Sequence, residues 1–264
     1  MFYGFYGAAS GMLNKQRALN VIGNNLTNVK TPGFRTGRLV TRTFDQELQV
    51  RIENGKKTPI GSLSPMSVVE EIDTLYDQAP LEETDRPFDM AIEGFGFFKL
   101  RSSEGEEFLT RNGNFSRDEE GYLVLDGVGR LQGQNGDIFV PNANFTVLES
   151  GTILDENGDR IDKIPIFEAR AENLKKHPNG SYVFSKKERE QNEGEIDGEE
   201  VEEELEPSIT KNAKIRQGIL ERSNVDINNE MARLIETQRA FQSCTQALKT
   251  IDQINQKTVS IASI

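Results

Sequence analysis

The chain has 264 residues, which is enough for one large domain or two smaller ones with a sizeable core. Its hydrophobic content is a modest 35%, and no run of about 18 apolar residues occurs, so the sequence predicts no membrane insertion. The net charge is −12, but residues 188–206 alone hold eleven acidic residues against one arginine, so the acidity is local to that tract.

The N-terminal segment shows the spacing of a helix with a narrow apolar seam. Phe5, Met12, Leu19 and Leu26 stand at seven-residue steps. Polar residues at 14–17 interrupt the apolar opening, so we expect no cleaved signal peptide. Residues 1–44 carry six basic residues and no acid, but the charges do not cluster, which argues against nucleic-acid binding.

The stretch NNLTNVKTPGF follows this helix and predicts a structural junction. Asparagine tolerates turn conformations and bonds to nearby backbone, and a proline followed by glycine stops a helix. A catalytic loop and a ligand-binding turn are the alternatives. The predicted junction residues are Asn24, Asn25, Asn28, Thr31, Pro32, Gly33 and Phe34.

The middle of the chain, about residues 86–185, reads as short strands. Asn-Gly and Glu-Gly pairs recur at the spacing of antiparallel hairpins, and no alternation of strand and helix points to a parallel nucleotide-binding sheet. The segment Asp155–Asp159 is similar to a calcium-binding loop at first sight. It lacks the glutamate that such a loop requires, and we expect a hairpin turn there.

The tract at residues 188–206 is expected to be a solvated surface loop, because self-repulsion among its carboxylates opposes a compact form. A cation-binding role for it is the alternative.

The C-terminal segment predicts a second, long helix. Ser223 and Asp226 have the spacing of a capping box, and no glycine or proline follows up to Ser263. Ile227, Leu234, Phe241 and Leu248 again stand seven residues apart. The companion positions are largely polar, with only Met231 apolar, followed by Gln238, Thr245 and Asp252. A pair of helices joined only by such a half-polar seam would be weakly stable. We expect the two chain ends to pack together and against other copies, with an ordinary amphipathic helix on a domain core as the alternative.

The sequence offers little for catalysis or for a cofactor. His177 is the only histidine and Cys244 the only cysteine, which leaves too few ligands for a zinc or multi-histidine site. Cys244 falls in the middle of the predicted helix and is expected to be a packed small residue. We therefore expect no catalytic residues, no metal and no cofactor. A cell-wall hydrolase would need a pair of carboxylates or a metal site, and no such constellation is recognisable.

Three segments together resemble one family. VIGNNLTNVKTPGFR is similar to the N-terminal signature of the bacterial flagellar rod and hook proteins. RPFDMAIEGFGFFKL and FLTRNGNFSRDEEGYLV resemble their central β segment, and LERSNVDINNEMARLIETQRAFQSCTQALKTIDQINQK resembles their C-terminal helix. The motifs cover about half of the chain, in the order in which the family has them.

The resemblance implies a structural subunit of the flagellar basal body. It implies that the chain leaves the cell through the flagellar type III export apparatus and polymerises into a helical tube around the export channel, beside other rod and hook subunits, transmitting torque to the hook. Within the family the distal rod subclass is the most similar, and a proximal rod or hook protein is the alternative. A surface adhesin or secreted effector would be expected to lack the C-terminal seam.

The expected fold class is α+β, with terminal helices packed like a coiled coil and a mainly antiparallel β domain between them. The expected division joins residues 1–44 and 221–264 in a helical inner domain and gives residues 45–220, with the acidic loop, to the β domain.

Overall fold

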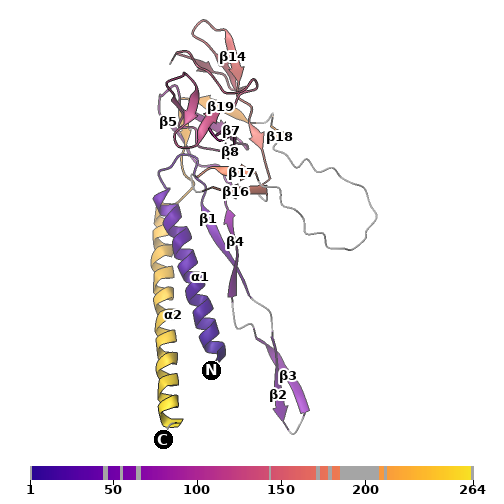
Figure 1. Ribbon diagram of the computed structural model, residues 1–264, viewed down its shortest axis with the longest axis vertical. Coiled ribbons are helices and arrows are strands. Elements are labelled where there is room, and N and C mark those ends of the chain that lie inside the picture. Colours follow the sequence, from indigo (N-terminus) through magenta and orange to yellow (C-terminus); the bar gives the residue numbers. More distant parts are fainter. Residues whose placement is uncertain are drawn as a thin grey trace, which may run out of the picture. The chain divides into compact units, whose positions relative to one another are not determined.

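The computed structural model describes residues 2–43, 47–53, 56–63, 67–142, 144–170, 173–177, 180–184, 208–210 and 213–262. It has a helix at each end of the chain and mostly antiparallel strands between them, which confirms the α+β class (Figure 1). The chain forms two compact units. Unit one comprises Met1–Val29, Thr36–Leu75 and Val225–Ile264, and unit two comprises Lys30–Arg35 and Tyr76–Asn224. The expected division at residues 44/45 and 220/221 stays a prediction.

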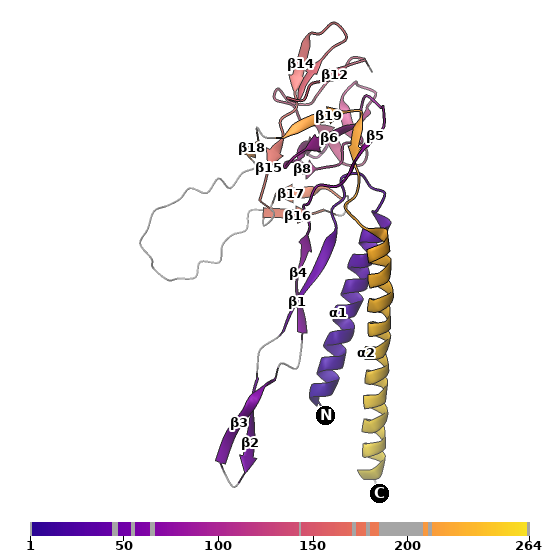
Figure 2. The same cartoon turned by 180° about the vertical axis from the view of Figure 1, so that it is seen from behind.

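Unit one contains the two helices, α1 (Phe2–Thr27) and α2 (Ile227–Ala262). They run side by side in opposite directions, as both views show (Figures 1 and 2). The four glycines in α1 lower its intrinsic helix stability. One of them permits a close approach, since a Cβ added at Gly11 would lie 3.4 Å from Cys244 Sγ. The α1 helix therefore relies on its partner for stability.

The start of α2 differs from the expected capping box. The Asp226 carboxylate accepts hydrogen bonds from the backbone N–H groups of Asn228 (2.9 Å) and Asn229 (3.3 Å). Asp226 is thus the N-cap itself, and the prediction that Ser223 caps the helix is wrong. A carboxylate at this position also complements the positive end of the helix dipole.

Unit one also holds four strands that precede residues 86–185, the stretch with the clearest strand pattern in the sequence. β1 (Gly37–Thr43) pairs with β4 (Ser67–Thr74), with a register shift between Val40 and Thr41. β2 (Glu47–Glu53) pairs with β3 (Lys56–Leu63). Both pairs are antiparallel, and in the sequence the β2–β3 pair lies between the two strands of the β1–β4 pair.

Unit two is built on a seven-stranded sheet in the order β16-β17-β8-β7-β11-β10-β9. Its strands are β7 (Phe98–Arg101), β8 (Glu107–Thr110), β9 (Ser116–Arg117), β10 (Leu123–Leu125), β11 (Gly129–Leu131), β16 (Leu174–Lys176) and β17 (Tyr182–Phe184). Three further strands, β12 (Thr146–Val147), β13 (Thr152–Leu154) and β14 (Arg160–Lys163), form a small sheet. Three two-stranded pairs complete the unit: β5 (Leu81–Glu83) with β20 (Ile219–Glu221), β6 (Met90–Glu93) with β19 (Lys214–Gln217), and β15 (Phe167–Glu168) with β18 (Ser208–Ile209).

The apolar core of unit two follows from the alternation of its strands. In β7, Phe98 and Leu100 are fully buried while the residues beside them are not, and β10 repeats the pattern at Leu123 and Leu125. Burial of these side chains stabilises the unit by roughly 1.5–3 kcal/mol each. The expected hairpin turn at Asp155–Asp159 is confirmed: it joins β13 to β14, and Gly158 N–H donates to the Asp155 carbonyl at 2.9 Å.

Candidate functional site

The first candidate feature is a polar contact of Asn25 in unit one. Asn25 is only 2% exposed, although it lies in the last turns of α1. Its amide nitrogen donates to the Gly37 carbonyl at 2.9 Å and to the Glu230 carboxylate at 3.2 Å. Its amide oxygen accepts from Gly37 N–H at 3.0 Å. One side chain thus links α1 to the first residue of β1 and to the first turns of α2. An amide can do this because it both donates and accepts.

The other asparagines of the junction act locally. Asn28 donates from its side chain to the Asn24 carbonyl at 2.9 Å, and Thr27 Oγ1 donates to the same carbonyl at 3.0 Å. The Asn24 carbonyl also accepts from the Asn28 backbone N–H at 3.2 Å, so three donors gather on one carbonyl at the end of the helix. The junction motif therefore begins as a helix terminator, as the sequence indicates.

Residues Thr31 to Phe34, in unit two, make a tight turn. Phe34 N–H donates to the Thr31 carbonyl at 3.3 Å, Pro32 follows the first residue, and Gly33 has a φ of 68°. Proline followed by a left-handed glycine is the pattern of a type II turn. Space adds a second reason for the glycine, because a Cβ at Gly33 would lie 2.4 Å from the Arg111 carbonyl carbon. The turn delivers Phe34 and Arg35 into the interior of unit two, where they are 3% and 1% exposed.

The second candidate feature is a buried ion cluster, which the residue-by-residue sequence analysis did not single out. The Glu221 carboxylate receives Arg35 Nη2 at 2.7 Å and Arg111 Nη1 at 3.2 Å. Glu221 also accepts from Ala79 N–H at 2.9 Å. The other terminal nitrogen of each arginine donates to a backbone carbonyl, Arg35 Nη1 to Asp77 and Arg111 Nη2 to Gly94, and Arg111 Nη1 also donates to the Ile92 carbonyl. The cluster connects five separate stretches of unit two.

Burial dominates the electrostatics of this cluster. Desolvation lowers the pKa of Arg111 to about 10, and the nearby Glu221 carboxylate only partly offsets that cost. Burial likewise raises the pKa of Tyr182, whose ring lies near both arginines. A cluster of two cations and one anion leaves an excess of positive charge in a poorly solvated place.

The predicted seam residues divide into two groups in unit one. Half-buried members are Met12, Leu19 and Leu26 on α1 and Leu234, Phe241 and Leu248 on α2. Phe5 and Ile227 are exposed, at 45% and 47%. Whether either group forms a subunit interface stays a prediction.

On α2, the line of buried and half-buried residues beside the seam, here called the companion line, lies one position earlier than the expected companion positions Met231, Gln238, Thr245 and Asp252. Thr237, Cys244 and Ile251 are half-buried, and Glu230 at the head of the same line is buried. Met231, Gln238 and Asp252 are exposed, and only Thr245 of the expected companions is half-buried. The expected companion line is therefore wrong, because the partner helix lies on the other side of the seam. The packed position of Cys244 is as expected.

The described residues offer no constellation for metal chemistry. In the residue ranges given above, no three His, Cys, Asp or Glu side chains gather in a way that could hold a metal ion. The lone histidine, His177, lies with its ring 5.2 Å from that of Phe108. No helix within those ranges combines the length and apolarity needed to span a bilayer. The acidic tract at residues 188–206 lies outside the described residues.

Comparison with known protein families gives three matches along the chain. A model described as "Flagella basal body rod protein" matches residues 5–35, and one described as "Flagellar hook protein FlgE/F/G D1 domain" matches residues 91–154. A third, "Flagellar basal body rod FlgEFG protein C-terminal", matches residues 216–261. Arg35, Arg111 and Glu221 each fall in a different one of the three matched segments.

Individual relatives agree with these matches. The flagellar basal-body rod protein FlgG of Bacillus subtilis is 32% identical over 281 aligned positions, which cover 99% of each chain. FlgF of Caulobacter vibrioides, also a flagellar basal-body rod protein, is 28% identical over 96% of this chain and 95% of its own. The flagellar hook protein FlgE of Treponema pallidum is 36% identical over 50% of this chain and 30% of its own.

Proposed function

Because this chain belongs to the family of flagellar basal-body rod proteins, we propose that it builds the distal part of the rod as a structural subunit. The observation that carries the assignment is the match to FlgG of Bacillus subtilis, which spans 99% of both chains. The hook protein match covers only 30% of that relative, which disfavours the hook alternative.

The proposed assembly is a helical tube in which the terminal helices line the inner channel. The two helices of unit one support this proposal. Apart from Ile22, Asn25 and Glu230, no described side chain on either helix is buried. Large apolar side chains remain exposed on both helices: Phe5, Tyr6, Leu13, Ile227, Met231, Ile235, Ile254, Val259 and Ile261. Exposed apolar surface of this extent suits contact with further copies packed in the manner of a coiled coil.

The proposed partners are other rod and hook subunits and the flagellar type III export apparatus. Export is proposed to proceed without cleavage of a signal peptide. Mass spectrometry of the protein isolated from basal bodies tests this point, and an N-terminus trimmed within α1 would contradict it.

A deletion strain tests the proposed place in the rod. Electron microscopy of its basal bodies is expected to show a proximal rod that stops short, without distal rod or hook, and the wild-type gene is expected to restore both. A complete rod that lacks only a hook would assign the chain to the hook. Loss of the whole rod would assign it to the proximal segment.

A further inference from the structure

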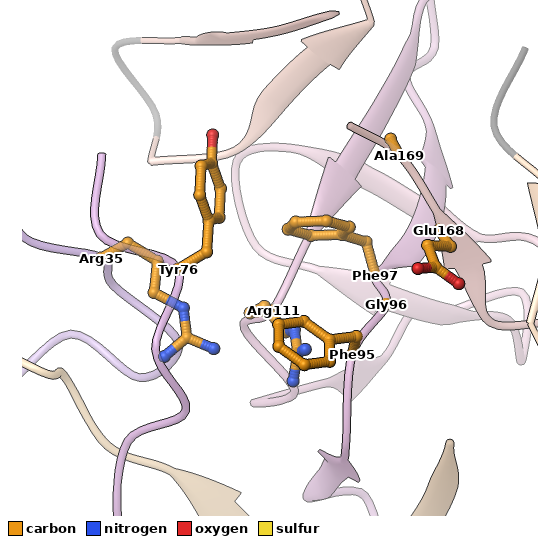
Figure 3. A pocket seen from close by; sticks show the side chains of 8 residues that line it. All are labelled: Arg35, Tyr76, Phe95, Gly96, Phe97, Arg111, Glu168 and Ala169. Carbon is orange, nitrogen blue, oxygen red and sulfur yellow. The ribbon is translucent and has the colours of Figure 1, made fainter. Parts of the chain in front are cut away.

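One pocket of unit two, beside the ion cluster, carries balanced charge (Figure 3). It has a volume of about 160 Å³, and Arg35, Arg111 and Glu168 line it. Glu221 pairs with both arginines from within the core. Two cations thus stand beside two carboxylates, and the pocket gives no reason to expect a charged ligand. An unbalanced group of charges occurs instead on the two helices of unit one.

The two helices of unit one bring their terminal halves together. The N-terminus of α1 and the C-terminus of α2 lie at the same end of the pair, as both views show (Figures 1 and 2). The register follows from the close approach of Gly11 to Cys244, since a Cβ built at Gly11 would lie 3.4 Å from Cys244 Sγ. Residues 2–17 of α1 and residues 239–262 of α2 are therefore called the terminal half of the helix pair.

The terminal half of the helix pair is strongly basic. It holds one acid, Asp252, and five basic residues: Lys15, Arg17, Arg239, Lys249 and Lys257. All five are exposed, and none of them pairs with a carboxylate among the residues that the structure describes. The rest of the pair, residues 18–27 and 227–238, holds two acids and one arginine. Positive charge is thus concentrated at one end of the pair.

Exposed apolar side chains accompany these charges. They are between 45% and 73% exposed and comprise Phe5, Tyr6, Leu13, Ile254, Val259 and Ile261. Leu13 and Arg17 are four residues apart and so share one face of α1. Ile254, Lys257 and Ile261 share one face of α2 in the same way. Apolar and basic side chains therefore occur on the same exposed surface.

This combination suits contact with an anionic lipid surface. Lysine and arginine are attracted to anionic headgroups, while aromatic and aliphatic side chains enter the boundary between headgroups and acyl chains. Charges farther away than about 8 Å are screened at physiological ionic strength. The local excess of positive charge therefore decides the contact, although the chain as a whole carries a net charge of −12.

The charge pattern favours lipid over a second copy as the partner of this end. Two terminal halves would repel each other, because both carry excess positive charge. The other half of the pair offers little negative charge, since Glu230 already bonds Asn25 and Arg233.

We propose that the terminal half of the helix pair binds the surface of an anionic lipid bilayer before the chain assembles. The exposed apolar side chains enter one face of the bilayer, and the lysines and arginines contact lipid phosphates. In an assembly, neighbouring copies replace the lipid on these side chains. The inference goes beyond the proposed function, and its test uses the unassembled chain, so its failure leaves the proposed place in the rod standing.

Sedimentation with lipid vesicles tests the proposal on the full chain, kept dilute enough to remain unassembled. Vesicles of equal parts phosphatidylglycerol and phosphatidylcholine are expected to carry the protein into the pellet, whereas vesicles of phosphatidylcholine alone are not. Added salt is expected to weaken the binding, because it screens the charges. Equal binding to both kinds of vesicle, or binding to neither, would overturn the proposal.

A pair of charge variants locates the contact. Lys249→Gln combined with Lys257→Gln is expected to weaken binding about twenty-fold, since each basic residue near an anionic surface contributes a factor of about five. The matched control, Lys175→Gln combined with Lys214→Gln, removes the same charge from exposed positions of unit two and should bind as the wild type does. Equal weakening in both variants would contradict a site at the helix end.

A pair of apolar variants separates lipid from charge attraction alone. Val259→Ser combined with Ile261→Ser is expected to weaken binding to the anionic vesicles roughly tenfold. Leu148→Ser combined with Ile209→Ser, again in unit two, is the control and should have no effect. Full binding by the first variant would show attraction by charge alone and would refute entry into the bilayer. If wild-type chain ignores vesicles and the lysine variant forms no tubes, the basic residues serve a second copy and lipid is excluded.

Discussion

Asn25 shows what sequence reading can and cannot provide at the scale of one residue. Its place in an asparagine-rich stretch predicts the end of a helix, and the local bonds of Asn28 agree with that prediction. The stretch does not reveal that Asn25 is buried and bonds Glu230, 205 residues further along the chain. For the same reason, the sequence does not indicate the ion cluster formed by Arg35, Arg111 and Glu221. Each lies within a segment that resembles the family, but only the fold brings the three together.

Replacement of Asn25 by alanine is expected to destabilise unit one. The change removes three hydrogen bonds and leaves buried groups of Gly37 and Glu230 without this partner. The expected loss is about 2–4 kcal/mol. Urea unfolding followed by the helical circular dichroism signal measures it. The matched control is Asn28→Ala, because the Asn24 carbonyl keeps Thr27 and the Asn28 backbone as donors. Equal losses in both variants would contradict the role assigned to Asn25.

Lys176 is expected to make the stability of unit two depend on pH. Although the residue as a whole is exposed, its ammonium group lies 3.6 Å from the centre of the Phe34 ring and donates to the Arg35 carbonyl at 2.9 Å. Desolvation lowers the pKa of Lys176 from 10.5 to about 8. The folded state therefore binds fewer protons than the unfolded state between these two pH values, and stability from this group rises with pH across that window.

Nuclear magnetic resonance titration of the Lys176 side chain is expected to give a midpoint near the lowered pKa of about 8. In unfolding experiments, the Lys176→Met variant should lack the part of the increase in stability that the lysine contributes. A midpoint at the ordinary lysine value would remove the basis of this prediction.

At the scale of elements, seven-residue spacing located both helices, and recurring turn pairs located the strands of unit two. β1 to β4 were not read as individual strands, although residues 45–220 were assigned to the β domain and the pair Asn54-Gly55 stands between β2 and β3 in the sequence. This Asn-Gly pair indicates a hairpin turn, but it lies outside residues 86–185, where the strand pattern is clearest. The spacing also could not fix which side of the α2 seam carries the companion line, because positions three and four residues away are equally close on a helix.

The two faces of α2 are expected to respond differently to charge. Leu234 is half-buried, so Leu234→Asp should destabilise the monomer's helix pair and also prevent tube formation. Met231 is 50% exposed, so Met231→Glu should leave the monomer's unfolding unchanged and still impair tube formation. Circular dichroism and electron microscopy provide the two measurements. Normal tubes from the Met231 variant would show that this face of α2 is not an assembly surface.

At the scale of the whole molecule, the two units differ in how much they bury. In unit two, Met90, Ile92, Phe98, Leu100 and Phe115 are each 0% exposed. In the helix pair of unit one, Ile22 is the single apolar side chain below a tenth exposed among the described helical residues. Ordering entropy is therefore offset much better in unit two.

Hydrogen exchange on a dilute monomer is expected to show this difference. Amides of β6, β7 and β8 should exchange slowly, and those of α1 and α2 should exchange faster than these, although more slowly than in the unfolded chain. Assembled tubes should then protect both helices. Strong protection of the helices in a proven monomer would contradict the inference that they depend on neighbouring subunits.

The strand pairing of unit two also determines the order in which its parts can fold. β6 pairs with β19 and β5 pairs with β20. The two buried arginines pair with Glu221. The N-terminal half of the unit therefore cannot form these contacts before a segment near the other end of the chain is present. A chain that emerges from the ribosome N-terminus first cannot close this unit until most of it has been synthesised, because long-range pairing is slow and its partners arrive late. Because β19 and β20 are synthesised late, unit two cannot close early, and a chain that is still open is the form that the proposed export through a narrow channel would require.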